Sequence, residues 1–157
     1  MKRIAVAPVL FAAVTACAGG GGGSSAPAIP GHGAISIAIV PNPIVARPAG
    51  GDEYDFPFDV VVRETGGRPV TISRVSADVL GPAGIRLAGE SYDAARIRSL
   101  GFDTTVPANG ELRYHFTPRK SVPDDRLFGG VRAELHVEGQ DDTGAPANAQ
   151  TTVTVTR

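Results

Sequence analysis

The sequence predicts an all-β fold, an antiparallel β-sandwich, for the region from Ala34 to Arg157. Apolar and polar residues alternate there in several short runs, which is the period of a half-buried strand. Turn-forming pairs such as Gly66-Gly67, Asn109-Gly110 and Gly129-Gly130 fall between these runs. No stretch keeps a helical period, so we expect one domain of roughly six or seven short strands.

Five runs have the alternation of strands that bury one face. They cover 34–39, 54–62, 112–116, 131–137 and 151–156, with inward residues that include Ile37, Phe58, Val60, Tyr114 and Leu135. A sixth strand is expected from Val70 to Leu80. Its alternation slips between Ile72 and Val75, which predicts a β-bulge near Ser73-Arg74.

Residues 85–106 are less regular than the rest of the domain. Ile85–Leu87 has the pattern of a short strand, and residues 92–100 fit either a strand or one helical turn. Asp141-Asp142 stands before the last strand, near Arg63 and Arg68 of a neighbouring loop, and we expect it to form a turn.

The N-terminal residues have the order of a secretory signal. Lys2 and Arg3 precede an apolar run from Ile4 to Val14, which is too short to span a bilayer. The next residues, Val14-Thr15-Ala16-Cys17, resemble the lipobox of bacterial lipoproteins. An ordinary signal peptide cleaved after small residues is the alternative.

The resemblance implies that the Cys17 thiol takes a diacylglyceryl group, with cleavage between Ala16 and Cys17 and further acylation by a fatty acid such as palmitate. Two or three acyl chains hold a protein lastingly at a membrane. The expected location is the cell envelope, and the outer membrane in a Gram-negative organism, because Ala18 is not the Asp that often retains such proteins.

Three regions follow from these observations. Residues 1–16 are expected to be a lipoprotein signal peptide, 17–33 the lipidated cysteine with a flexible linker rich in Gly, Ser and Pro, and 34–157 the β-sandwich domain. His32 falls in the linker, where we expect a solvated imidazole. The five consecutive glycines lead into prolines rather than a helix, so they do not form a phosphate-binding loop.

The domain is similar to bacterial immunoglobulin-like (Ig-like) domains. The stretch from Val137 to Gly144, followed by the strand Thr151–Thr156, carries this resemblance. The resemblance implies an Ig-like sandwich, although the paired cysteines and core tryptophan of antibody domains are missing. Jelly-roll and other sandwich topologies remain open.

Composition excludes several partners and cofactors. Loss of Lys2 and Arg3 with the signal peptide leaves 13 basic residues against 16 acidic ones, a charge balance that does not favour nucleic acid. Because Cys17 is the single cysteine, neither an intrachain disulfide nor a cysteine-based zinc site can form. We expect no cofactor.

No catalytic set can be assembled from the sequence, so the chain is not expected to be an enzyme. There is no G-x-S-x-G motif, and His115 and His136 lie on outward phases of strands in different sheets, which argues against a shared zinc. Asp55, Asp59 and Arg63 alternate with the inward residues of the expected strand 54–62 and are expected to form an exposed polar face. The expected function is a lipid-anchored extracytoplasmic Ig-like binding or structural module.

An accessory domain or carbohydrate-binding module of an envelope enzyme is the alternative, although the chain has no tryptophan for sugar stacking. The partner, an unknown envelope protein or glycan, is expected at the long connections 41–53, 81–91 and 118–130, away from the linker. The residues expected to contact it are Arg47, Asp52, Arg119, Lys120, Asp124, Asp125 and Arg126. Asp52, Glu53, Asp124 and Asp125 could also converge on calcium, or simply solvate their loops.

Overall fold

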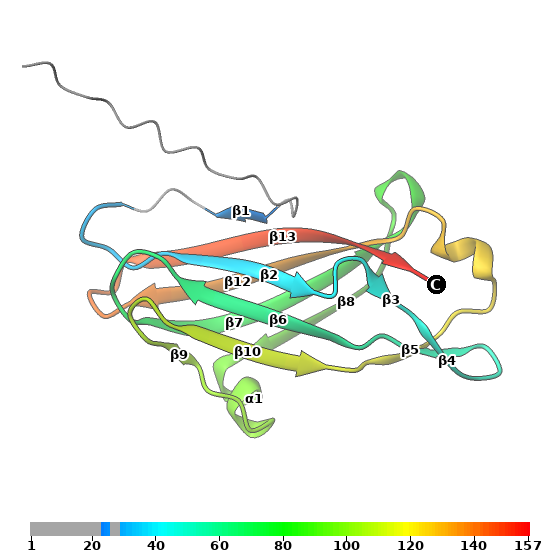
Figure 1. Cartoon of the computed structure of the whole chain (residues 1–157), viewed down its shortest axis with the longest axis horizontal. Coiled ribbons are helices and arrows are strands. Elements are labelled where there is room, and N and C mark those ends of the chain that lie inside the picture. The colour runs from blue at the N-terminus through cyan, green and yellow to red at the C-terminus, as the bar shows by residue number, and fades with distance from the viewer. Residues whose placement is uncertain (1–22, 26–28) are drawn as a thin grey trace, which may run out of the picture.

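The computed structural model describes residues 23–25 and 29–157 of the chain (Figure 1). Cys17 and the whole signal segment, including Ala16, lie outside these residues. The strands are β1 (Gly23–Ser25), β2 (Ile35–Val40), β3 (Ile44–Val45), β4 (Arg47–Gly50), β5 (Glu53–Asp55), β6 (Phe58–Glu64), β7 (Val70–Leu80), β8 (Arg86–Asp93), β9 (Thr105–Val106), β10 (Glu111–Phe116), β11 (Arg119–Ser121), β12 (Arg132–Asp141) and β13 (Pro146–Thr156). The helices are η1 (Pro82–Gly84), α1 (Ala94–Ser99) and η2 (Asp125–Phe128). In the described chain, no helix has the length and apolar character needed to cross a membrane.

The strands form two facing layers, which confirms the predicted sandwich. One layer has the order β1-β13-β12-β7-β8, and β3 pairs in parallel with β13 at its edge. The other layer is split into β10-β6-β2 and β11-β5-β4. The two parts follow one another, since the Phe56 N–H donates to the Pro118 carbonyl at 3.0 Å. Placing strands β2, β6 and β10 opposite β7, β12 and β13 is the Ig-like arrangement.

The core lies between the layers and uses the predicted inward residues. Ile35 and Val60 from one layer and Leu135, Val137 and Val153 from the other are at most 2% exposed. Burying each such side chain contributes about 1.5–3 kcal/mol. Alternation of β-branched residues therefore explains both the strands and the contact between them.

The predicted bulge in β7 is confirmed. Arg74 pairs with Glu138 while Ile72 pairs with Gly139, so Ser73 has no partner position on β12. The Ser73 hydroxyl donates instead to the Glu138 carbonyl at 3.1 Å. The extra residue restores the inward phase after the slip in the sequence.

Two strand predictions need correction. The expected strand 54–62 is broken at Phe56-Pro57, because proline has no N–H for the ladder, and Tyr54 lies in the separate strand β5. Residues 81–91 are not a long loop, because β8 begins at Arg86 and pairs with β7 from there. Helix α1 then begins at Ala94 and is capped by Asp93, whose side chain accepts from the Arg96 N–H at 2.7 Å.

The linker is less free than predicted. Within 17–33, β1 adds to the edge of β13, with Gly23 opposite Thr151. Edge strands have free backbone groups that favour such pairing. The Gly33 N–H donates to the Asp141 carboxylate at 2.9 Å, which fixes the end of the linker to the domain.

Candidate functional site

An apolar cleft of about 710 Å³ lies between the two layers. β-Branched core residues such as Val60, Val75 and Val155 form part of its wall. All five phenylalanines of the described chain also line it: Phe56, Phe58, Phe102, Phe116 and Phe128. Ligand cavities in proteins have this size range and this composition.

The phenylalanines are half-buried, whereas the smaller core valines are fully buried. Phe58 lies 5.6 Å from Phe116 and Phe102 lies 6.0 Å from Phe116, measured between ring centroids. Val60 and Val137 are 0% exposed. Large aromatic side chains normally dominate a closed core. Here they face a cleft that residues 23–25 and 29–157 leave unfilled.

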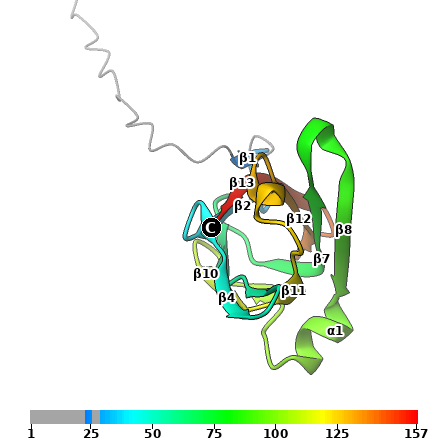
Figure 2. The same cartoon turned by 90° about the vertical axis from the view of Figure 1, so that its right-hand side faces the viewer.

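The cleft exists because one hairpin diverges from the sandwich. Seven of the eight residues of β8 are exposed, and Leu87, which lines the cleft, is 54% exposed. Figure 2 shows the β7–β8 hairpin standing apart from the layer that contains β4, β10 and β11. Strands β8 and β11 are edges of different sheets. The cleft opens between them.

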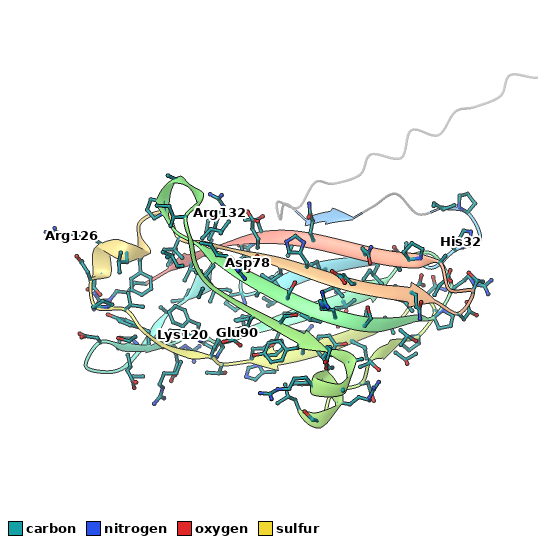
Figure 3. The ribbon with its side chains drawn as sticks, turned by 180° about the vertical axis from the view of Figure 1, so that it is seen from behind. His32, Asp78, Glu90, Lys120, Arg126 and Arg132 are labelled. Carbon is teal, nitrogen blue, oxygen red and sulfur yellow. The ribbon has the colours of Figure 1, made fainter. Side chains whose placement is uncertain are left out.

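Polar side chains gather at the mouth of the cleft. Lys120 of β11 reaches across to Glu90 of β8, with Nζ 2.9 Å from Oε1 (Figure 3). The Tyr92 hydroxyl donates to the other Glu90 oxygen, and Arg96 also lines this side. The hydrogen bond from Tyr92 and the one from Lys120 lower the pKa of Glu90, against the opposing effect of burial.

The ion pair at the mouth is weakly held. The Glu90 and Lys120 side chains are 45% and 54% exposed. Exposed pairs of this kind contribute about 0.2–1 kcal/mol. Solvent or a ligand can therefore take the place of either partner at small cost.

The predicted outward histidines lie where the sequence placed them. His115 is on β10 and His136 on β12, in opposite layers. His115 pairs with Asp59 at 2.7 Å, and Arg113 contacts the same carboxylate. The hydrogen bond with His115, followed by that with Arg113, lowers the pKa of Asp59. The expected exposed polar phase on this layer is therefore charge-paired.

The residues expected to contact a partner lie on neighbouring elements at one end of the sandwich. We call Arg47, Asp52, Arg119, Lys120, Asp124, Asp125 and Arg126 the distal strip; they come from β4, the β4–β5 turn, β11 and η2. The Val122 N–H donates to the Asp52 carbonyl at 2.7 Å, which joins two of these loops. Figure 3 shows Arg126 at the opposite end of the molecule from His32.

The calcium candidate does not assemble, although its two loops meet. Asp125 accepts from the Tyr54 hydroxyl at 2.8 Å and pairs with Arg157. Asp124 accepts from the Arg126 N–H at the start of η2. Among residues 23–25 and 29–157, no group of three or more His, Cys, Asp or Glu side chains is placed to hold a metal. These carboxylates instead serve hydrogen bonds and ion pairs of the loops.

Two carboxylates at the linker end are buried and hold backbone N–H groups of the loops, which the sequence analysis did not predict. Glu64 is 4% exposed and accepts from four backbone N–H groups: Ala34 and Gly66 on one oxygen, Gly67 and Asn109 on the other. Burial alone would raise the pKa of Glu64, but these donors together lower it. Glu64 continues the inward phase of Val60 and Val62, and that position was the available signal.

Asp141 is the second of these carboxylates. Its oxygens accept from the Thr143 hydroxyl and from the N–H groups of Gly33, Thr143 and Ala145. The Thr143 hydroxyl and then the Gly33 N–H hold the pKa of Asp141 well below its usual range. His32 Nδ1 lies 3.4 Å from Asp141, so the imidazole that was expected to be solvated packs partly against the domain, with its side chain 42% exposed. The predicted turn at Asp141-Asp142 is confirmed, with Arg68 paired to Asp142 at 2.7 Å.

Comparisons with known proteins identify the fold. No family model matches the chain, and no curated protein does. The X-ray structure of a Northeast Structural Genomics Consortium target, SoR45, is similar with a TM-score of 0.53 at 10% identity, over 82% of this chain and 90% of that one.

Two further structures are similar at lower scores. A Bordetella pertussis protein named as ApaA gives a TM-score of 0.49 at 11% identity, over 83% of this chain and 99% of that one. The CARDB domain of a Pyrococcus furiosus protein, in complex with di-metal ions, gives 0.35 at 12% identity, over 80% and 90%. At these identities a likeness concerns the fold alone. With the strand order above, the fold is an all-β, Ig-like sandwich.

Proposed function

We propose that this protein is a lipid-anchored, extracytoplasmic Ig-like binding module of the bacterial cell envelope, without catalytic activity, and that its cleft takes an apolar ligand. The observation that carries the ligand site is the set of five half-buried phenylalanines around the cleft. Leaving this much aromatic surface unfilled costs stability that an apolar ligand would restore.

The chemistry of the cleft supports binding rather than catalysis. Its titratable side chains in the described chain, Glu90, Tyr92, Arg96, His115 and Lys120, lie towards the mouth. Glu90, Tyr92 and Lys120 bond with one another, and His115 bonds with Asp59 on the outer face. The interior offers hydrocarbon and aromatic surface. Phenylalanine without tryptophan also favours an apolar ligand over a sugar.

A neutral fluorescent probe, N-phenyl-1-naphthylamine, tests the ligand site. It should bind the full chain carrying Cys17→Ser and lose about 10-fold in affinity when Leu87→Lys places a charge in the cleft. Ile85→Lys is the matched control, because Ile85 is a similarly exposed apolar residue of the same connection but does not line the cleft. Equal binding by the two lysine variants would exclude the cleft as the site.

The lipid anchor is tested separately. A chain with Cys17 intact should incorporate a radiolabelled fatty acid and fractionate with the envelope, because acyl chains on the thiol partition into the bilayer. Cys17→Ser should abolish both, since a hydroxyl cannot form the thioether. Labelling of the Cys17→Ser chain would refute the anchor.

The distal strip remains our proposal for a macromolecular partner. The strip lies at the opposite end of the domain from Gly33, where the linker joins the domain beside Glu64 and Asp141. Alanine blocks at 119–126 and at 66–68 separate the two ends. Loss of a partner with the second block alone would place the contact at the linker end instead.

A further inference from the structure

The structure assigns a ligand class to the cleft: we propose an amphiphile with one apolar part and an anionic head group, the head bound by Lys120 and Arg96. The proposal rests on the apolar site proposed above and adds the charge of the ligand to it.

The mouth has an excess of positive charge. Arg96 and Lys120 face one carboxylate, that of Glu90. His115, which also lines the cleft, is already paired with the carboxylate of Asp59. A negative group entering the mouth would balance the second cation, whereas a positive group would add to the repulsion.

Glu90 itself shows where an anionic head would bind. Its carboxylate accepts from the Tyr92 hydroxyl and from Lys120 Nζ, and its pKa is lowered by both and by the charge of Arg96. Two donors, the Tyr92 hydroxyl and Lys120 Nζ, therefore converge on one carboxylate, and the positive charge of Arg96 acts on it as well. Because Glu90 and Lys120 are about half exposed, an incoming carboxylate or phosphate can replace Glu90 without opening the fold.

The interior behind the mouth accepts hydrocarbon. Phe116 packs on Tyr92 at 5.9 Å between ring centroids, and this pair leads from the mouth to Phe58. Leu135 and Val155 complete the wall from the facing layer. A charged group placed there would lose its hydration without gaining a partner, so the head group has to stay at the mouth.

Three amphiphiles with the same chain and different head groups test the proposal by displacing N-phenyl-1-naphthylamine from the full Cys17→Ser chain, which has no acyl chains of its own. Dodecanoate should bind about 10-fold more tightly than dodecanol, and dodecyltrimethylammonium most weakly. Lysophosphatidylglycerol, run in parallel, shows whether the anion can be a phosphate of a membrane lipid as well as a free carboxylate.

Variants of the mouth connect the preference to named residues. Lys120→Gln should reduce the preference for dodecanoate over dodecanol to about 2-fold, and Glu90→Gln, which removes the competing carboxylate, should tighten dodecanoate several-fold. Arg126→Gln is the matched control, a cation at the same end that does not line the cleft. Arg126→Gln should change neither this preference nor the binding of the neutral probe.

The two proposals fail in different ways. Equal displacement by dodecanoate and dodecanol, or a preference that survives Lys120→Gln, would overturn the assignment of an anionic head and leave the apolar site intact. Failure of the neutral probe to bind at all would overturn the apolar site itself.

Discussion

Glu64 offers a sharp test of how the linker end of the sandwich is held. In Glu64→Gln the Oε1 position can still accept from the N–H groups of Ala34 and Gly66. The amide NH₂ replaces Oε2, so the N–H groups of Gly67 and Asn109 lose their acceptor and face another donor. Each buried donor left unsatisfied costs about 1–3 kcal/mol, which gives roughly 3 kcal/mol for two partly buried donors.

The assay is thermal and urea unfolding near neutral pH. A loss of about 3 kcal/mol lowers the melting temperature of a domain of this size by roughly 10 °C. Glu111→Gln is the matched control, because Glu111 makes an exposed pair with Arg63 at 2.7 Å, and it should cost less than about 1 kcal/mol.

The pH dependence of unfolding provides a second test of the stabilisation by Glu64. The pKa of Glu64 is lowered in the fold, so its stabilisation is complete above the ordinary glutamate pKa and disappears as the pH falls through the lowered value. Stability of Glu64→Gln should therefore fall less steeply on acidification than that of the parent chain. Equal melting of Glu64→Gln and Glu111→Gln would refute the reasoning.

Two further predictions concern the core and the linker. Phe58→Ala should lower the free energy of unfolding by about 2–4 kcal/mol, since Phe58 packs on Phe116 but is only half-buried. Asp59→Ser, on the outward phase of the same strand, should lower it by less than about 1 kcal/mol. Equal losses in urea unfolding would contradict the assignment of faces. Asp141→Ala should release Gly33 and speed proteolytic cleavage of the linker. Asp142→Ala loses only an exposed pair with Arg68 and should leave the cleavage rate unchanged. Unchanged cleavage of the Asp141→Ala variant would show that Asp141 does not hold the linker.

The sequence was sufficient to predict those structural features that depend on a local pattern of residues. Alternation in 131–137 and 112–116 predicted β12 and β10, and the slip after Ile72 predicted the bulge at Ser73. The outward positions of His115 and His136 followed from the same period. These features depend on which face of a strand is buried, and the alternation of neighbouring residues indicates that face.

Features that depend on distant parts of the chain could not be predicted in this way. β8 was expected only as a short strand at Ile85–Leu87, because seven of its eight residues are exposed and it shows no alternation. The cleft arises where the β7–β8 hairpin diverges from the facing layer, and its phenylalanines had the same pattern as core residues. Docking of the linker depends on Asp141, which is distant from Gly33 in the sequence.

Backbone amide NMR during titration with dodecanoate tests the central claim, that the cleft is a ligand site, most directly. We expect saturable shifts concentrated on residues that line the cleft, such as Val75, Val131 and Phe128, and small shifts at Thr152 and Thr154, which lie on the exposed face of β13. Shifts spread evenly over the domain, or none at cleft residues under saturating dodecanoate, would contradict the account.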